Sequence, residues 1–280
     1  MTDRESHLKA ITIGVRNHVG MVELEFVPEL VGHVATALQK IDYEVSEFPA
    51  DTMSSVEVGA RITEMIAACT VDDLLIVHVL SHGELAEGDG TVYVLGSDGV
   101  KDPALDVDQW LKNIQLGGPR TLFLLDLCYS GTAARLPWQH RIDADQTRGW
   151  VIAACQRDQA AYDGRFSRAL VAVLNGLREN EFDVDATVPR VPLTTIARAL
   201  RQEVNRLSAE ADSYGQTVTA SLQDISSDPD LPFFANVGYM DNQRSRMRAG
   251  LNSGSVRSST SWTRTWTPGT FWTGLPALAG

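Results

Sequence analysis

The chain has 280 residues, of which 44% are hydrophobic and 21% are charged, values that suit a soluble globular protein with a sizeable core. Its formal net charge of −12 at pH 7 argues against nucleic acid and against a membrane as partners, because affinity for either comes largely from positive side chains. No stretch has the roughly 18 to 20 apolar residues that span a bilayer, and the first residues lack the apolar centre of a signal peptide. The three scattered cysteines indicate neither disulfides nor zinc. We therefore expect a cytoplasmic protein.

Apolar runs of strand length alternate with longer segments of helical period, a pattern that predicts a parallel sheet with helices on both faces. In chain order, we expect strands at residues 10–15, 43–47, 74–80, 121–126 and 150–155, with a sixth at 231–236. Apolar residues three and four positions apart predict amphipathic helices at residues 28–41, 54–69, 103–114, 167–177 and 193–211. Residues 88–99, an apolar alternation between two Asp-Gly pairs, predict a short hairpin.

The character of the chain changes at about Met240, so we divide it into a domain at residues 1–239 and a tail at residues 240–280. The tail is rich in Ser, Thr, Gly and Arg, and it contains three of the six tryptophans in a stretch with no clear helical period, namely Trp262, Trp266 and Trp272. This composition suits a mobile tail or a linker. Arg and Trp are also enriched at binding hot spots, which favours a regulatory segment that binds an activating ligand or partner.

Two of the predicted strands end in residues that carry chemistry. One runs into His82 and Gly83, and the other ends at Asp126 and runs into Cys128. Because the carboxyl ends of parallel strands meet at one edge of a sheet, we expect the imidazole and the thiol to lie close together. An imidazole promotes formation of the thiolate, which is the attacking species, and the backbone N–H groups of Gly83 and Cys128 can bind an oxyanion. The two turns therefore contain the parts of a thiol peptidase site.

The other residues of these types have different interpretations. Cys is among the most buried residue types, so we interpret Cys69, on a helix face, and Cys155, at the end of an apolar strand, as packing residues. His78 lies inside a strand on the same face as His82 and is interpreted as a core or supporting histidine. Asp126 would cost several kcal/mol if it were buried without a partner, which favours a functional role.

The strand followed by SHG and the later strand followed by DxCxSG resemble the caspase-like cysteine peptidases, a family of caspases, paracaspases and metacaspases, and most of all its bacterial members. Three further segments, WVIAACQRDQAA, GRFSRALVAVL and LPFFAN, resemble the small-subunit half, so the resemblance covers about residues 7–237. It implies a caspase-hemoglobinase fold, a three-layer α/β/α sandwich with a mostly parallel six-stranded sheet. It also implies a cysteine endopeptidase with His82 as catalytic histidine, Cys128 as the nucleophile that forms a thioester, and Gly83 and Cys128 as oxyanion donors.

The resemblance further implies a class of substrate. In the metacaspase and paracaspase branches, the Asp two residues before the nucleophile lines the pocket for the side chain that precedes the scissile bond, and Asp126 occupies that position. The loop before the first helix, where aspartate-specific caspases place an Arg, contains Glu23 and Glu25 instead. Carboxylates form paired charge-assisted hydrogen bonds with guanidinium groups, so we expect a protein or peptide substrate that is cleaved after Arg or Lys.

No cofactor or metal is expected. Metacaspases often need calcium, but the carboxylates in the corresponding regions, Asp98, Asp106 and Asp108, have an imperfect spacing for it. Residues 133–148 are short compared with the linkers that are cut in caspase maturation, so we expect no obligatory processing. The bacterial relatives often act in regulated cell death or anti-phage defence, a role that the resemblance alone implies here. The alternatives are a catalytically silent scaffold or sensor, and a peptide ligase on the same fold.

Overall fold

The computed structural model of the chain describes residues 7–86, 91–135, 146–212, 215–221 and 231–254. The chain divides into two units, Met1–Met240 and Asp241–Gly280, and each is described by itself. Within the described ranges, no helix is both long enough and apolar enough to cross a membrane.

The first unit is built on a six-stranded sheet with the strand order β2-β1-β3-β6-β7-β8. Its strands are β1 (Leu8–Val15), β2 (Glu44–Ala50), β3 (Leu74–Leu80), β6 (Arg120–Asp126), β7 (Gly149–Ala153) and β8 (Thr219–Ala220). All neighbouring strands are parallel except β7 and β8. Every residue of β3 is buried, because this central strand is covered on both faces. The predicted α/β class with a mostly parallel six-stranded sheet is confirmed.

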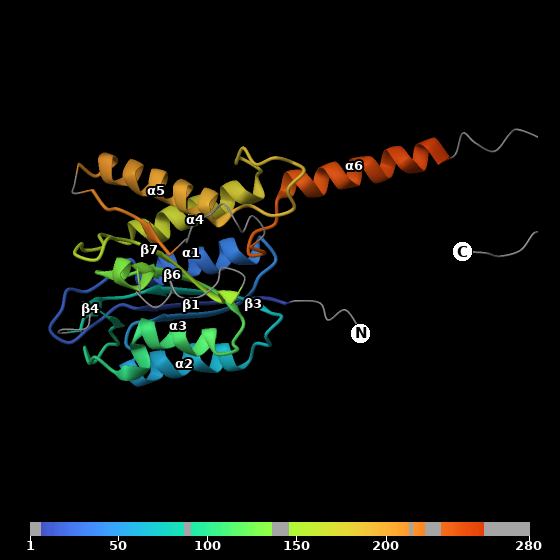
Figure 1. Ribbon diagram of the computed structural model, residues 1–280. Helices are drawn as coiled ribbons and strands as arrows, with labels where there is room; N and C mark the ends of the chain where they lie inside the picture. Colours follow the sequence, from blue (N-terminus) through green and yellow to red (C-terminus); the bar gives the residue numbers. More distant parts are fainter. Residues whose placement is uncertain (1–6, 87–90, 136–145, 213–214, 222–230, 255–280) are drawn as a thin grey trace, which may run out of the picture. The chain divides into compact units, whose positions relative to one another are not determined.

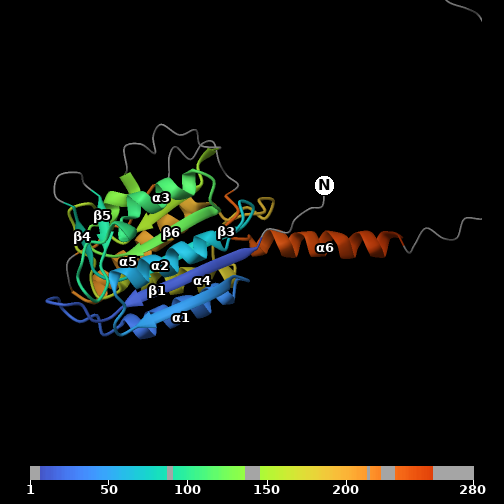
Figure 2. The same cartoon turned by 90° about the horizontal axis from the view of Figure 1, so that it is seen from below.

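Helices cover both faces of this sheet and make the predicted three layers (Figure 1). One face packs against α1 (Val27–Gln39), α4 (Arg165–Arg178) and α5 (Leu193–Glu210), and the other against α2 (Ser55–Ala67) and α3 (Val107–Gln115). Figure 2, seen from below, shows α2 and α3 over the strands. Successive strand residues point to opposite faces, so Ile76 belongs to the first hydrophobic core and Val77 to the second.

The predicted sixth strand at residues 231–236 is wrong. The sixth strand is the short β8, and within 231–236 only Ala235 forms an isolated β-bridge. The apolar run is nevertheless buried, since Phe233 and Phe234 lie in the core under α1 and α5. Pro232 has no N–H to donate to a neighbouring strand. The apolar pattern therefore reflects burial of an irregular segment and not strand pairing.

The hairpin begins earlier in the chain than predicted. It consists of the antiparallel strands β4 (Gly83–Leu85) and β5 (Val92–Val94), so its first strand follows His82 directly. Residues 87–90, which include the first Asp-Gly pair, lie outside the described residues. The predicted helix at 103–114 is divided into a 3-10 turn, η1 (Pro103–Leu105), and α3, because the Asp106 side chain caps the start of α3.

One helix was not predicted. Helix α6 (Val237–Gly254) begins at the end of the first unit and supplies the described part of the second. Its apolar residues mark no clear face, which is why periodicity gave no signal, but Met, Arg, Gln and Ala in this segment are good helix formers. Trp262, Trp266 and Trp272 lie outside the described residues.

Candidate active site

The pairing of β3 with β6 brings His82 and Cys128 to the same edge of the sheet. The last pair in the register of these two strands is Leu80 with Asp126, and His82 and Cys128 each follow it by two residues. The two backbones then approach closely, because a Cβ placed on Gly83 would lie 2.5 Å from the carbonyl oxygen of Cys128. Only glycine fits this approach. The glycine after His82 thus allows the two turns to pack against each other.

The imidazole of His82 is oriented by a backbone group. Its Nε2 lies 2.8 Å from the carbonyl oxygen of Val22, in the loop between β1 and α1. A carbonyl only accepts hydrogen bonds, so Nε2 carries the proton, and Nδ1 of the neutral ring is the basic nitrogen. Val22 therefore takes the orienting role that a carboxylate has in a catalytic triad. This contact could not be predicted from the sequence, because every residue has a carbonyl.

A second histidine, also missed by the sequence reasoning, lies beside His82. The ring centroids of His18 and His82 are 4.7 Å apart, and the ring planes meet at 79°. The side chain of His18 is buried, with Nε2 2.9 Å from Ser81 Oγ and 3.2 Å from the Leu95 carbonyl. Burial, and then the nearby His82, lower the pKa of His18 to about 4, so its ring is neutral at pH 7.

The thiol of Cys128 is half-buried, with Sγ 4.0 Å from the Ala161 carbonyl. Burial raises the pKa of this thiol, and the carboxyl group of Asp126 acts in the same direction. The turn that follows Cys128 is the 3-10 helix η2 (Ser130–Arg135), so no α-helix starts there whose dipole would lower the pKa of the thiol. Cys128 is therefore a thiol at neutral pH, and a base such as His82 must remove its proton during attack.

The turn after Cys128 is packed onto the end of β7. Tyr129 has a left-handed backbone with φ of 62°, and its N–H donates to the Gln159 carbonyl at 3.0 Å. Ser130 Oγ lies 3.5 Å from Sγ of Cys155, which is fully buried, as the packing interpretation expects. A Cβ on Gly131 would overlap the Cys155 carbonyl. Ser130 and Gly131 of the motif thus allow the turn after Cys128 to pack against the end of β7.

The amide of Gly83 is available as an oxyanion donor. The N–H of Leu95 donates to the His82 carbonyl at 3.0 Å, so His82 and Leu95 form a hydrogen-bonded pair. Because such pairs alternate along an antiparallel ladder, Gly83 and Val94 form a non-hydrogen-bonded pair. The ladder of β4 and β5 therefore does not use the Gly83 N–H, which can pair with a developing negative charge, as proposed for the Cys128 amide.

Asp126 is buried beneath this edge of the sheet. Its Oδ2 accepts hydrogen bonds from Ser167 N–H at 3.0 Å and from Ser167 Oγ at 2.7 Å. Burial raises the pKa of Asp126 to about 6, although the bonds from Ser167 oppose this shift. The supporting histidine His78 is fully buried, with Nε2 3.0 Å from Ser167 Oγ, and burial lowers its pKa to about 3. Among the described residues, Asp126 has no ion pair, so its charge at neutral pH is not balanced.

The loop between β1 and α1 is less acidic than its sequence suggested. Glu23 forms an ion pair with Arg16 at 2.6 Å, and Arg16 also lies 3.4 Å from Asp51. Arg16, at the end of β1, therefore balances the charge of Glu23 in this loop. Glu25 is exposed. Asp126 is thus the better candidate for binding a basic side chain than Glu23.

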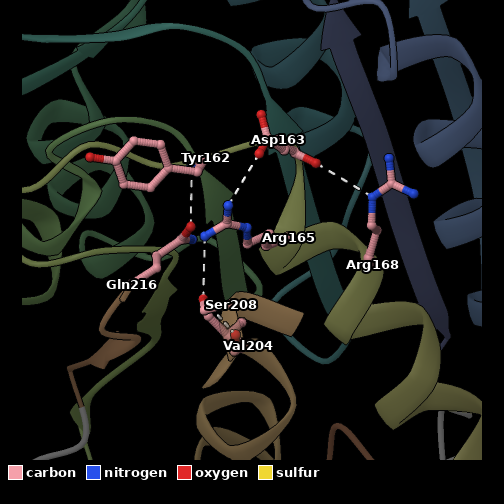
Figure 3. A network of polar contacts seen from close by, with 7 residues as sticks. All are labelled: Tyr162, Asp163, Arg165, Arg168, Val204, Ser208 and Gln216. Carbon is pink, nitrogen blue, oxygen red and sulfur yellow. Dashed lines mark hydrogen bonds and ion pairs between the residues drawn. The ribbon is translucent and has the colours of Figure 1, made fainter. Parts of the chain in front are cut away.

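The loop that follows β7 carries the Ala161 carbonyl beside Cys128. A polar network fixes this loop (Figure 3). The side chain of Gln216 joins the two ends of this loop, since its Oε1 accepts from Tyr162 N–H at 3.1 Å and its Nε2 donates to the Ala154 carbonyl at 2.9 Å. The buried guanidinium of Arg165 pairs with Asp163 at 3.2 Å and donates to Ser208 Oγ at 3.3 Å. The position of the Ala161 carbonyl beside Cys128 follows from these contacts.

The carboxylates considered for calcium have other partners. Asp98 accepts from the hydroxyl and the N–H of Ser55 at 2.6 and 3.1 Å, Asp106 caps α3, and Asp108 lies 2.6 Å from Lys112. In the ranges that the structure describes, no group of three His, Cys, Asp or Glu residues could hold a metal ion.

Comparison with known proteins supports the fold. No family model and no curated protein matches the sequence. Among solved structures, 229 chains match. One is caspase-1 from Spodoptera frugiperda, which is similar over 79% of this chain and 87% of its own, with a TM-score of 0.52 and 16% sequence identity. At this identity the likeness shows the fold alone, and the caspase-like fold is confirmed.

Proposed function

We propose that this chain is a cysteine endopeptidase that hydrolyses peptide bonds in protein substrates. The observation that carries the proposal is the shared register of His82 and Cys128, which leave neighbouring parallel strands at the same level. The hydrogen bond from His82 Nε2 to the Val22 carbonyl supports it, because it leaves Nδ1 as the base. Gly83 adds an amide that its own ladder does not use.

The chemistry follows from these positions. His82 Nδ1 takes the proton of the Cys128 thiol as sulfur attacks the substrate carbonyl, and the amides of Gly83 and Cys128 stabilise the oxyanion. The imidazolium then gives its proton to the leaving amine, and a thioester with Cys128 remains. Water, deprotonated by His82, attacks the thioester, and the thiol leaves with the proton. The cycle consumes one water for each peptide bond.

Cleavage after Arg, and less well after Lys, is the second part of the proposal. Asp126 supports it, because this carboxylate lacks a counter-charge among the described residues and both bonds from Ser167 go to one oxygen, Oδ2. A guanidinium guest would balance the charge through Oδ1. In such a desolvated place, losing one charged partner costs about 2 to 5 kcal/mol.

The test is a positional-scanning library of fluorogenic peptides, applied to the wild type, Cys128→Ala, His82→Ala and a Cys69→Ala control. We expect turnover with Arg before the scissile bond in the wild type and the control, and its loss in the other two, since nucleophile and base act as a unit. More than a few per cent of wild-type turnover in Cys128→Ala would contradict the assignment. Cys69 is the matched control because it follows the C-terminal end of α2, just before β3 begins, and so lies away from the edge of the sheet where β3 ends.

Two other functions remain as outcomes of the same test. A silent scaffold or sensor would give no turnover in any variant, and a ligase would give joined peptides when the products are weighed by mass spectrometry. A role in regulated cell death or defence rests on the sequence resemblance alone.

A further inference from the structure

We propose that His18 is the positioning residue for His82, because its ring packs against the catalytic imidazole and holds it in its working orientation. This inference rests on the proposed function and deepens it, because it names a group that sets the efficiency of the base without contacting the substrate. Three observations carry it: the anchoring of His18, its contact with His82, and its charge.

His18 is itself held firmly. Ser81 Oγ donates to the Leu95 carbonyl at 2.7 Å, so its lone pairs accept the N–H of His18 Nε2, which lies 2.9 Å away. The same nitrogen is 3.2 Å from the Leu95 carbonyl, an acceptor only. Both neighbours therefore select the tautomer with the proton on Nε2. Ser81 directly precedes His82 in the chain, so His18 is fixed to the segment that it supports.

The contact between the rings supplies a restraint that the Val22 bond does not. One hydrogen bond at Nε2 fixes the direction of a single ring nitrogen, but the imidazole can still turn about that bond. The ring of His18, 4.7 Å away at 79°, limits this rotation. With both contacts in place, Nδ1 of His82 keeps one direction, as a base that must meet the Cys128 thiol requires.

The charge of His18 suits this role. Burial lowers the pKa of His18 to about 4, and the proximity of His82 acts in the same direction, whereas the backbone groups of Leu95 and Arg16 oppose the shift. His82 must become an imidazolium when it takes the thiol proton, and a second cation 4.7 Å away would oppose that step. A neutral aromatic ring restrains His82 without this repulsion.

The experiment compares His18→Ala, His18→Phe and His18→Gln with wild type, with His82→Ala as the positive control. The first readout is the rate at which iodoacetamide alkylates Cys128 between about pH 5 and pH 9, a range that includes the pKa of an ordinary imidazole. Mass spectrometry measures this rate on the Cys128 peptide, with the Cys69 peptide as internal reference. The second is kcat and KM on the best library peptide. The third is the melting temperature.

We expect His82→Ala to lower alkylation of Cys128 at neutral pH about 100-fold, the usual contribution of a general base, and His18→Ala to lower it about 10-fold. The loss should appear in kcat with KM little changed, because His18 does not touch the substrate. His18→Phe, which keeps a ring, should recover most of the rate. His18→Gln keeps an N–H donor but not the ring, so it should stay near the rate of His18→Ala.

A matched control is His33→Ala on α1, an exposed histidine 3.8 Å from Glu29, for which we expect wild-type rates. A folded His18→Ala protein with wild-type alkylation and kcat would overturn the inference. So would recovery by His18→Gln and not by His18→Phe, since His18 would then only anchor its loop. If the wild type cleaves no peptide, the proposed peptidase function fails, while the alkylation rates still decide the role of His18.

Discussion

The buried carboxylate of Asp126 lowers the stability of the folded protein at neutral pH, and the same group is proposed to bind the basic side chain of the substrate. Its pKa is about 6 in the folded protein against an ordinary value of 3.8, so the folded state binds the proton more tightly than the unfolded state does. The stability that this tighter binding provides is fully present below pH 3.8 and is lost as the pH rises through about 6. Above that pH, the buried carboxylate costs about 3 kcal/mol relative to its protonated form.

Asp126→Asn should therefore remove the loss of stability between about pH 4 and pH 6 that this carboxyl causes. Urea unfolding of both proteins at several pH values checks this, and the wild type should have the steeper pH dependence. At pH 7 we expect the variant to be more stable than the wild type, because Ser167 can still donate to the amide oxygen and no buried charge remains.

The same substitution should lower turnover of Arg substrates by about 30-fold or more, the equivalent of at least 2 kcal/mol. The library measures this on the folded variant. A preference of the wild type for Asp before the scissile bond would contradict the proposal that Asp126 binds a basic side chain. Unchanged turnover of Arg peptides by Asp126→Asn would contradict it as well.

Gly83→Ala tests the close approach of the two catalytic turns. The new Cβ would lie 2.5 Å from the Cys128 carbonyl and 2.9 Å from Cβ of Leu127, so the turns must separate. We expect kcat to fall about 100-fold, since a displacement of about 1 Å has that effect on a positioned base and nucleophile. Gly32→Ala, which on α1 meets only the flexible end of Glu47, is the control and should keep its activity. Equal kinetics for the two variants would show that the approach is unimportant.

Side-chain chemistry is what the sequence reveals at this scale. His82, Gly83 and Cys128 could be selected because their types and order after two apolar strands suit acyl transfer. The Val22 carbonyl could not, since a backbone atom has no sequence signature. The ion pair of Arg16 with Glu23 was also missed, because it depends on how the end of β1 meets its own loop.

Among the elements, the loop after β7 depends on Gln216. Gln216→Ala would remove the hydrogen bonds to the Tyr162 N–H and the Ala154 carbonyl, at a cost of about 1 to 3 kcal/mol in the free energy of unfolding. We expect kcat/KM to fall about 10-fold as well, because the loop carries the Ala161 carbonyl beside Cys128 and the Gln159 carbonyl that holds Tyr129.

The control for this loss is Ser54→Ala, which removes the capping box at the start of α2. It should cost about 1 kcal/mol of stability with unchanged kcat/KM. Denaturant unfolding and kinetics on both variants separate the two effects. If kcat/KM falls together with the free energy of unfolding in Ser54→Ala as it does in Gln216→Ala, the network around Gln216 has no specific effect on Cys128.

Long buried strands and amphipathic helices could be predicted to within a few residues, because apolar periodicity records burial directly. Strand β8 could not, since two residues carry no period, and its pairing depends on the neighbouring β7. Residues 231–236 were assigned wrongly because an apolar run has the same appearance in a strand and in a buried irregular segment. Helix α6 was not predicted, because its apolar residues mark no clear face and its composition was interpreted as that of a tail.

At the scale of the whole molecule, the first unit holds the six-stranded sheet and the three hydrophobic core clusters of the described residues. A protein that ends at Met240 should therefore fold with the melting temperature of the full chain, which differential scanning fluorimetry measures. Altered basal activity of this truncated protein would support a regulatory tail, and unchanged activity and activation would indicate a linker. Failure to fold would show that residues 241–280 contribute to the core.

The register of β3 and β6 has a practical consequence for dividing the chain. Between α3 and β6 lies an exposed turn with Leu116 at 87% exposure and Gly117 at φ of 130°. Opening the chain there would place His82 on one polypeptide and Cys128 on the other, and neither fragment would hold a complete dyad. Fusing the fragments to two proteins that dimerise should restore cleavage only when the β3 and β6 ladder reforms. If the proposed peptidase activity holds, the divided chain would serve as a split reporter of protein association.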